Sequence, residues 1–155
     1  MKALYTNIQG QGRPLVLLHG WGMNSRVWQP VIPALVQRAQ VIAVDLPGHG
    51  LSRDVPLESL QQTLAQLIPH IPENAIIMGW SLGGLLAQAL AHALPERVAG
   101  LILVASTPKF VADETWQPAL AVEVLAAFAE QLQTDYQATV KRFFALQFLG
   151  IKTDT

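Results

Sequence analysis

The sequence contains no cysteine, so disulfide bonds and thiolate metal sites are excluded. Charged residues are scarce: Asp, Glu, Lys and Arg make up 14% of the 155 residues, well below the share of about a quarter in typical soluble domains. The formal net charge is −1, so the composition gives no sign of a polycationic protein that binds nucleic acid or anionic membranes. At this length we expect one globular domain with a real core.

Long hydrophobic runs are also missing, although hydrophobic residues make up 51% of the chain. No apolar stretch reaches the roughly 20 residues needed to span a bilayer. The N-terminal stretch MKALYTNIQGQG lacks the apolar core of a signal peptide. The four histidines, His19, His49, His70 and His92, do not have metal-ligand spacing. We therefore expect a cytoplasmic protein without a membrane segment, metal or cofactor.

Short apolar runs alternate with helical patterns over the first 110 residues. The strand-like runs are residues 4–8, 15–20, 41–45, 75–79 and 98–106. The helical patterns between them are residues 27–39, 57–71 and 82–94. Strands joined by crossover helices predict an α/β protein with a mostly parallel, doubly wound sheet and right-handed connections.

The pattern changes after Thr107. Residues 120–133 and 135–150 both have helical periodicity, and no further strand follows them. Two consecutive helices after a parallel sheet favour an appended cap rather than another βαβ unit. We predict that residues 1–110 form a core and that residues 111–155 form the start of a helical cap.

The most informative motif is Gly79-Trp80-Ser81-Leu82-Gly83, a G-x-S-x-G with an apolar strand before it and a helical pattern after it. Such a turn forces the serine into a strained backbone conformation, and its glycines let the strand and helix approach closely. The helix dipole and the Leu82 N–H then favour negative charge beside Ser81. A glycine-rich turn of a nucleotide-binding fold is the alternative, but such turns follow the first strand.

A second glycine-containing segment, His19-Gly20-Trp21-Gly22, follows the first buried strand. Its turn can direct a backbone N–H, that of Trp21, toward the position reached by the Leu82 N–H, and two such donors form an oxyanion hole. By itself the segment fits a plain strand-to-loop turn equally well. We expect His19 to be a structural hydrogen-bonding residue rather than a general base.

The segment DLPGHGLS, which begins at Asp45, has the composition of a tight turn after a strand. We expect Asp45 to cap this loop. A catalytic pairing of Asp45 and His49 with Ser81 is the less favoured alternative.

Four stretches together resemble the α/β-hydrolases: LVLLHGWGMNSRVW, VIAVDLPGHGLSR, MGWSLGGLLA and LPERVAGLILVAS. The wording HGW, GWSLGG, VASTPKF and VKRFFALQ is similar to the pimeloyl-[acyl-carrier protein] methyl ester esterases of biotin synthesis, over essentially the whole chain. The resemblance implies an α/β-hydrolase fold and a serine carboxylesterase that cleaves the methyl ester of pimeloyl-acyl carrier protein without a cofactor.

The resemblance also implies roles for particular residues. The nucleophile falls on Ser81, and the oxyanion and substrate contacts fall on Trp21, Ser81 and Leu82. A substrate-lining stretch of the cap matches five consecutive residues: Phe143, Phe144, Ala145, Leu146 and Gln147. Helical periodicity alone favours ordinary helix packing for this stretch.

The same family recognises an acidic acyl carrier protein through basic residues of the cap. Lys141 and Arg142 are present here, but Ala138 stands where relatives can carry arginine. After Arg97 the chain has four basic residues against six acidic ones. Docking of the carrier protein is therefore implied by the resemblance and not by the charge pattern.

In α/β-hydrolases the catalytic residues follow the order serine, acid, histidine. His92 is the only histidine after Ser81, and it lies within the helical pattern that follows the serine. We therefore expect the acid, the histidine and the last core strands to lie outside this chain, either in a longer esterase or in a complementary C-terminal fragment. The alternatives are a broad-specificity esterase, lipase or thioesterase of the same fold, and a truncated, non-catalytic acyl-binding fragment.

Overall fold

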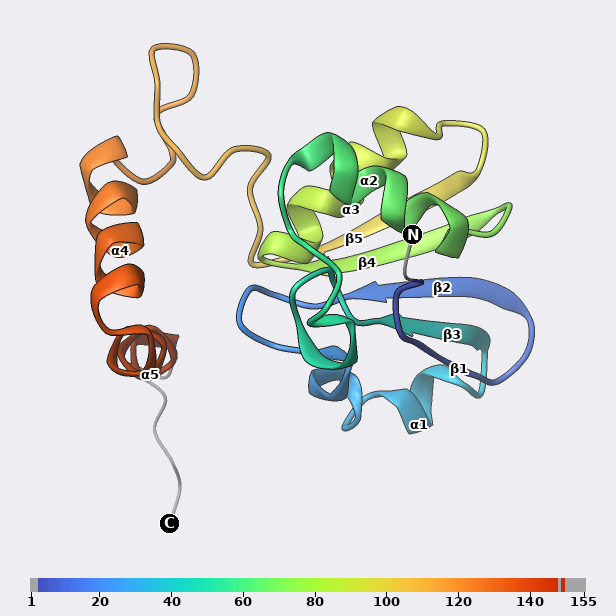
Figure 1. The fold of residues 1–155 in the computed structure, drawn as a ribbon. Helices are drawn as coiled ribbons and strands as arrows, with labels where there is room; N and C mark the ends of the chain where they lie inside the picture. The colour runs from blue at the N-terminus through green and yellow to red at the C-terminus, as the bar shows by residue number, and fades with distance from the viewer. Residues whose placement is uncertain (1–2, 148, 150–155) are drawn as a thin grey trace. The chain divides into compact units, whose positions relative to one another are not determined.

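The computed structural model describes residues 3–147 and 149, and its chain divides into two compact units, Met1–Pro108 and Lys109–Thr155. Figure 1 labels the helices and strands of both units. No helix of the described residues is long and apolar enough to cross a membrane.

The first unit is built on a five-stranded sheet with the strand order β1-β3-β2-β4-β5 (Figure 1). Its strands are β1 (Thr6–Gln9), β2 (Arg13–Leu18), β3 (Ala39–Val44), β4 (Ala75–Trp80) and β5 (Val98–Val104). Only β1 runs antiparallel to its neighbour, and the pairs β2–β3, β2–β4 and β4–β5 are parallel. The predicted α/β architecture with a mostly parallel sheet is confirmed.

Alternate residues of a strand point to opposite faces of the sheet. The central strands offer apolar side chains to both faces, and helices cover each of them. On one face, Val16 and Ile77 pack in a core cluster with Leu86 and Leu90 of α3 (Leu82–Ala93). The helix α2 (Leu60–Leu67) contributes to the same cluster. Each fully buried aliphatic side chain contributes roughly 1.5–3 kcal/mol to stability. This packing fixes α3, and with it the turn between β4 and α3.

On the other face, Leu17 and Val41 pack against Trp28 and Ile32. These two residues come from a 3₁₀ helix, Ser25–Trp28, and a single turn, α1 (Ile32–Leu35). The prediction of one helix over residues 27–39 is therefore wrong. Pro30 and Pro33 lack the N–H groups that a continuous helical ladder through this segment requires, so the chain forms two short pieces instead.

The predicted helix over residues 57–71 is also shorter than expected. α2 begins after Ser59, whose hydroxyl accepts a hydrogen bond from Gln62 N–H at 3.2 Å. It gives way to a 3₁₀ turn, Ile68–His70, that contains Pro69. The N-cap and the proline thus set the two ends of this helix.

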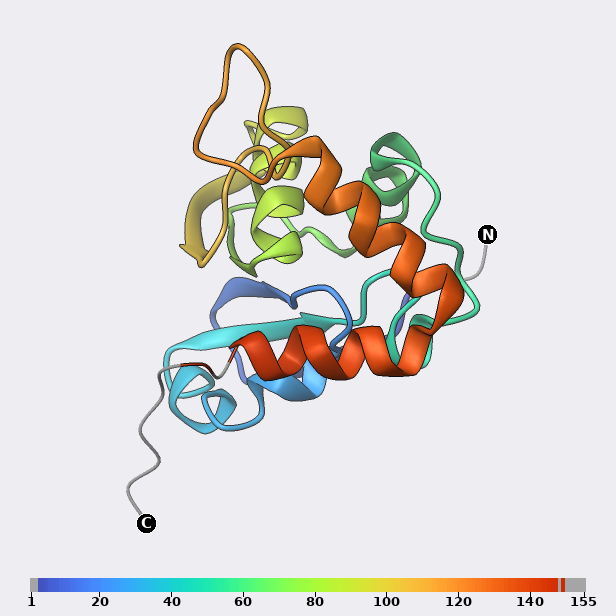
Figure 2. The ribbon, with the colours of Figure 1, turned by 90° about the vertical axis from the view of Figure 1, so that its left-hand side faces the viewer.

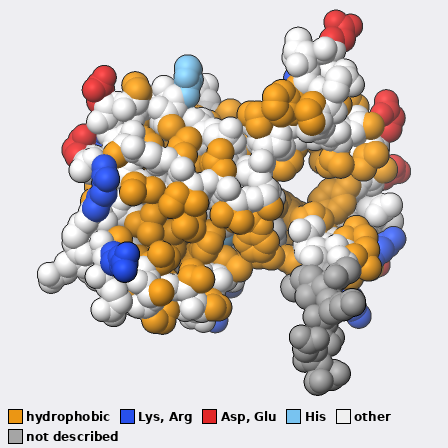
Figure 3. Space-filling model, turned by 180° about the vertical axis from the view of Figure 1, so that it is seen from behind, with side chains coloured by type: hydrophobic (Ala, Val, Ile, Leu, Met, Phe, Trp, Pro, Cys, Tyr) orange, Lys and Arg blue, Asp and Glu red, His pale blue; other side chains and the backbone are white. Residues whose placement is uncertain are grey.

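The outer strand β5 exposes apolar side chains. Leu101, Ile102, Leu103 and Val104 are 38–45% exposed. In β4, buried residues alternate with half-buried ones, so one face of this part of the sheet is incompletely covered. Seen from behind, the first unit shows hydrophobic side chains gathered over a broad area (Figure 3). Among the described residues, no strand pairs with the outer edge of β5.

The second unit contains two successive helices, α4 (Val122–Thr134) and α5 (Tyr136–Gln147), which Figure 2 shows end to end with a sharp turn between them. Asp135 occupies the turn, and its carboxylate accepts a hydrogen bond from Ala138 N–H at 3.0 Å. The buried Thr139 hydroxyl donates to Gln131 O at 3.0 Å and ties the helices together. The predicted end of this helix at residue 150 lies outside the described residues.

Candidate active site

Ser81 lies at the corner between β4 and α3. It is the N-cap residue of α3 and has φ 52° and ψ −115°. A non-glycine residue in this region is strained by roughly 1–3 kcal/mol. The strained backbone conformation predicted for Ser81 is thus present. The side chain stands at the N-terminus of a twelve-residue helix, where the helix dipole favours negative charge.

Glycines on both sides of Ser81 allow three backbones to meet. A Cβ at Gly79 would collide with Gly83 O, and a Cβ at Gly83 would collide with Leu18 O. Because the obstructing atoms belong to the backbone, no side-chain rotation relieves these contacts. The glycines of the motif are therefore required by the close approach of α3 to β4 and β2.

The loop of residues 20–22 follows β2 closely and reaches the same corner. β2 and β4 are parallel neighbours, so their carboxyl ends lie at one edge of the sheet. A Cβ built on Gly20 would lie 3.5 Å from Ser81 Cβ. The structure thus brings the segment that carries Trp21 beside Ser81 and Leu82. Leu82 is the first residue of α3, a position whose N–H has no intrahelical acceptor.

Two histidines hold this loop through their ring nitrogens. His19 Nε2 accepts a hydrogen bond from Leu46 N–H at 2.9 Å, so its Nδ1 carries the proton and donates to Gly20 O at 2.8 Å. His49 Nε2 accepts from Gly22 N–H at 3.1 Å, and its Nδ1 donates to the carbonyl of Pro47 at 2.8 Å. Both rings are occupied by backbone groups, which confirms the structural role predicted for His19. The same contacts make His49 unsuitable as a base for Ser81.

Burial lowers the pKa of His19 from 6.5 to about 4. The neighbouring His49 also lowers this pKa, whereas the hydrogen bond to Gly20 O and the charge of Asp45 raise it. His19 is therefore neutral at neutral pH, which leaves its Nε2 able to accept the Leu46 N–H.

Asp45 is buried and caps its loop, as predicted. Its two carboxylate oxygens accept hydrogen bonds from Ser25 N–H at 2.7 Å and Leu51 N–H at 2.8 Å. Both oxygens are thus engaged with the backbone of the first unit. The less favoured catalytic pairing of Asp45 and His49 with Ser81 has no support in these contacts.

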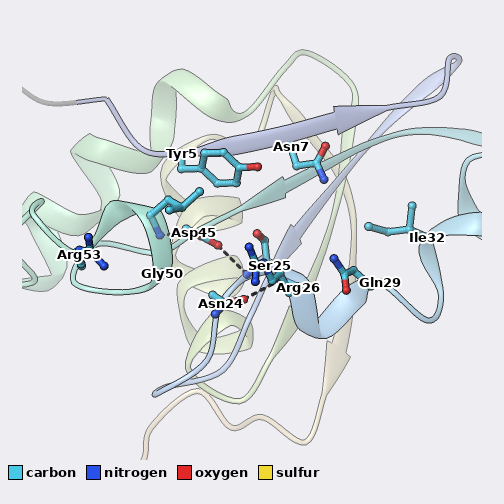
Figure 4. Close-up of a pocket in the computed structure, with 11 residues that line it drawn as sticks. Tyr5, Asn7, Asn24, Ser25, Arg26, Gln29, Ile32, Asp45, Gly50 and Arg53 are labelled. Atoms are coloured by element: carbon cyan, nitrogen blue, oxygen red, sulfur yellow. Dashed lines mark hydrogen bonds between the residues drawn. The ribbon is translucent and has the colours of Figure 1, made fainter.

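A pocket of about 420 Å³ opens beside Asp45 (Figure 4). Its walls come from the N-terminal segment with β1, the 3₁₀ helix after β2 with the start of α1, and the segment after β3. The residues that line it are Tyr5, Asn7, Asn24, Ser25, Arg26, Gln29, Ile32, Asp45, Gly50, Leu51 and Arg53. Ser81, Trp21 and Leu82 are not among them, so this pocket is separate from the serine site.

The remaining two histidines lie away from Ser81. His70 precedes β4 and stands at the opposite end of that strand from Ser81. His92 is exposed in the last turn of α3, roughly 16 Å along the helix axis from the serine at 1.5 Å per residue. All four histidines lie among the described residues, and none of them is placed to take a proton from Ser81.

The predicted substrate-lining stretch lies on α5, in the second unit. The centroid of the Phe143 ring lies 5.7 Å from that of Phe128 on α4 and 5.7 Å from that of Phe144. Phe143 therefore takes part in the ordinary helix packing that periodicity favours. Ala145, Leu146 and Gln147 are exposed. A role in substrate binding remains a prediction for all five residues of the stretch.

One residue at the corner is missed by the sequence analysis. The Ser106 hydroxyl donates a hydrogen bond to Ser81 O at 2.8 Å. Ser106 follows β5, the parallel neighbour of β4, so the signal was a hydroxyl residue just beyond the carboxyl end of an adjacent strand.

A family model described as the alpha/beta hydrolase fold matches residues 13–152. The chain belongs to this family. It is 47% identical over 148 residues to the pimeloyl-[acyl-carrier protein] methyl ester esterase of Vibrio cholerae serotype O1, covering 96% of this chain and 58% of that protein. The protein of the same name from Yersinia enterocolitica is 47% identical over 154 residues, 99% of this chain and 59% of that protein.

Solved structures agree with this family. The esterase EaEST from Exiguobacterium antarcticum has a TM-score of 0.80 and 26% sequence identity, over 90% of this chain and 55% of that chain. The present chain thus spans between half and two thirds of the length of the proteins it matches.

Proposed function

We propose that this chain is the nucleophile-bearing part of a serine carboxylesterase that hydrolyses the methyl ester of pimeloyl-acyl carrier protein in biotin biosynthesis. The observation that carries the proposal is the strained Ser81 at the start of α3, with the 20–22 loop against it. The proposed substrate is the one given in the names of two relatives that are 47% identical to this chain.

In the proposed mechanism Ser81 Oγ attacks the ester carbonyl carbon and forms a tetrahedral intermediate. The backbone N–H groups of Trp21 and Leu82 stabilise its negative oxygen. A histidine takes the serine proton and delivers it to the departing methanol, and water then releases the acyl group by the same route. No metal or cofactor takes part in these steps.

The histidine and its acidic partner come, in this proposal, from a complementary C-terminal segment. Two observations support this. All four histidines of the chain are engaged elsewhere or distant from Ser81. The apolar edge of β5 has no partner strand among the described residues, and it offers a place for further strands.

The cap part of the proposal assigns the acyl chain to the face of α5 around Phe143 and Phe144. Leu146, which belongs to the same matched stretch, is 61% exposed. The exposed Lys141 and Arg142 are the proposed contacts for an acidic carrier protein.

The test is a burst titration with a short p-nitrophenyl ester. The chain is measured alone and mixed with a C-terminal fragment of the Vibrio cholerae relative, each with and without Ser81→Ala. We expect Ser81-dependent release of p-nitrophenol in the mixture, at least about 10³-fold faster than for the variant. Release that is equal in Ser81→Ala would contradict the assignment of the nucleophile.

A broad-specificity esterase of the same fold is the second candidate, favoured by the likeness to the esterase EaEST. Comparing hydrolysis of a pimeloyl methyl ester with and without attached carrier protein separates the two. Equal rates indicate the broad-specificity enzyme. Acyl binding without hydrolysis, in the presence of the C-terminal fragment, indicates the third alternative, a non-catalytic binder.

A further inference from the structure

The strained conformation of Ser81 requires groups that hold it in place. Its φ of 52° lies where non-glycine residues are unfavourable. Such a conformation persists only when the surrounding structure determines it from several sides. For Ser81 one of these sides is the end of β5 and the residues that follow it.

Both backbone polar groups of Ser81 are engaged. Its N–H donates to Val104 O at 2.9 Å, which extends the pairing of β4 and β5 by one residue. Its carbonyl accepts from Gly84 N–H at 2.9 Å and Leu85 N–H at 3.2 Å, the bonds of a helix start. The Ser106 hydroxyl adds a further bond at 2.8 Å, from a side chain twenty-five residues further along the chain.

The contact between Ser106 and Ser81 depends on two neighbouring residues, Ala105 and Gly84. Ala105 has φ 44°, so the chain turns sharply between β5 and Ser106. On the other side, a Cβ at Gly84 would collide with Cβ and Oγ of Ser106. The second glycine of the Gly83-Gly84 pair therefore leaves the space that the Ser106 side chain occupies.

The bond to Ser81 O also acts on the next N–H. The carbonyl of Ser81 and the N–H of Leu82 belong to one planar trans peptide unit, so they point in opposite directions. A donor that fixes the carbonyl oxygen fixes the direction of the Leu82 N–H. Hydrogen bonding to the carbonyl also polarises the unit, which strengthens the N–H as a donor.

We propose that Ser106 is a positioning residue: its hydroxyl orients the Ser81–Leu82 peptide so that the Leu82 N–H meets the oxyanion. This inference rests on the proposed function, in which that N–H stabilises the tetrahedral intermediate. Ser106 acts through the peptide unit and does not contact the substrate.

The test uses Ser106→Ala, which removes the hydroxyl, and Ser106→Thr, which keeps it. Ser59→Ala is the matched control, because Ser59 also uses its hydroxyl in a backbone hydrogen bond, at the start of α2. The first readout is the amide residual dipolar coupling of Leu82, which reports the direction of its N–H bond. The second is the rate of Ser81 acylation by a p-nitrophenyl ester in the mixture with the C-terminal fragment. Melting temperatures show that each variant is folded.

We expect Ser106→Ala to change the Leu82 coupling and to slow acylation about tenfold at constant KM, less than the loss of a whole oxyanion donor. Ser106→Thr should behave like the unchanged chain, and Ser59→Ala should lower only the melting temperature. An unchanged Leu82 coupling in Ser106→Ala would overturn the proposal, as would a loss of activity equal to that of Ser59→Ala. If the unchanged chain is not acylated at all, the proposed function fails, and the coupling still decides whether Ser106 orients the peptide.

Discussion

At the scale of single residues, the loops beside Ser81 are held by hydrogen bonds between polar side chains and backbone groups. His19, His49 and Asp45 each connect two loops at the carboxyl edge of the sheet through N–H and C=O groups. Residue types that serve as bases and acids in other sites are used here to position the loop beside Ser81. Of these residues, His19 has the clearest consequence for stability.

We predict that the chain loses stability as the pH falls from 6.5 to about 4 because of His19. Its folded-state pKa of about 4 lies below the value of 6.5 for the unfolded chain. The folded state therefore binds fewer protons, and the stability present above pH 6.5 is lost as the pH falls through this range. The shift corresponds to about 3 kcal/mol.

Urea unfolding at a series of pH values measures this effect. His19→Asn, which cannot become charged, should show a flatter profile over the same range, and His92→Asn is the exposed control. The difference between the two profiles separates His19 from the carboxyl groups. Parallel profiles for the two variants would contradict the prediction.

At the scale of elements, the position of Ser81 depends on how closely α3 approaches β2. The backbone of α3 at Gly83 lies against the carbonyls of Leu18 and His19. A sheet and a helix are normally separated by side chains, so this contact is closer than ordinary packing permits.

We predict that Gly83→Ala destabilises the chain by about 3 kcal/mol or more, because the new Cβ meets rigid backbone atoms. Gly100→Ala is the matched control, since a Cβ there has only Ile76 Cγ1 within reach, at 3.9 Å. We expect the control to change the unfolding free energy by less than about 0.5 kcal/mol. Thermal unfolding of both variants is the measurement, and similar midpoints would disprove the close approach.

The elements also show which features were predictable from sequence. The parallel strands and α3 follow from apolar runs and helical periodicity, and the G-x-S-x-G motif locates Ser81 between them. The split of the predicted helix over residues 27–39 depends on two prolines whose effect was underestimated. The contact of Ser106 with Ser81 joins residues distant in the sequence. Such pairs have no local pattern, so only the fold reveals them.

At the scale of the whole chain, the first unit ends its sheet on an apolar edge. Four consecutive residues of β5 are 38–45% exposed, and none of them is charged. Natural edge strands are usually protected by charges, prolines or bulges. The pairing of β5 with β4 has one irregularity, between Val98 and Gly100, but residues 101–104 carry neither a charge nor a proline. We therefore expect the chain alone to associate with other copies.

We predict concentration-dependent self-association of the isolated chain, measured by analytical ultracentrifugation. Leu103→Lys should shift the distribution toward monomer, because a charge at a paired edge is costly to bury. Leu51→Lys places the same change on a residue that is 63% exposed in the 3₁₀ helix Gly50–Ser52, and it should leave the association constant unchanged. A monodisperse monomer at all concentrations would contradict the prediction.

The bond between Ser81 N–H and Val104 O has a consequence for biosynthesis. The ribosome makes Ser81 before it makes β5, and Ser106 is added twenty-five residues after Ser81. Until β5 leaves the exit tunnel, the serine has no partner for its N–H and is free to relax to an ordinary conformation. We therefore expect the strained conformation of Ser81 to form only after β5 has been synthesised and has paired with β4.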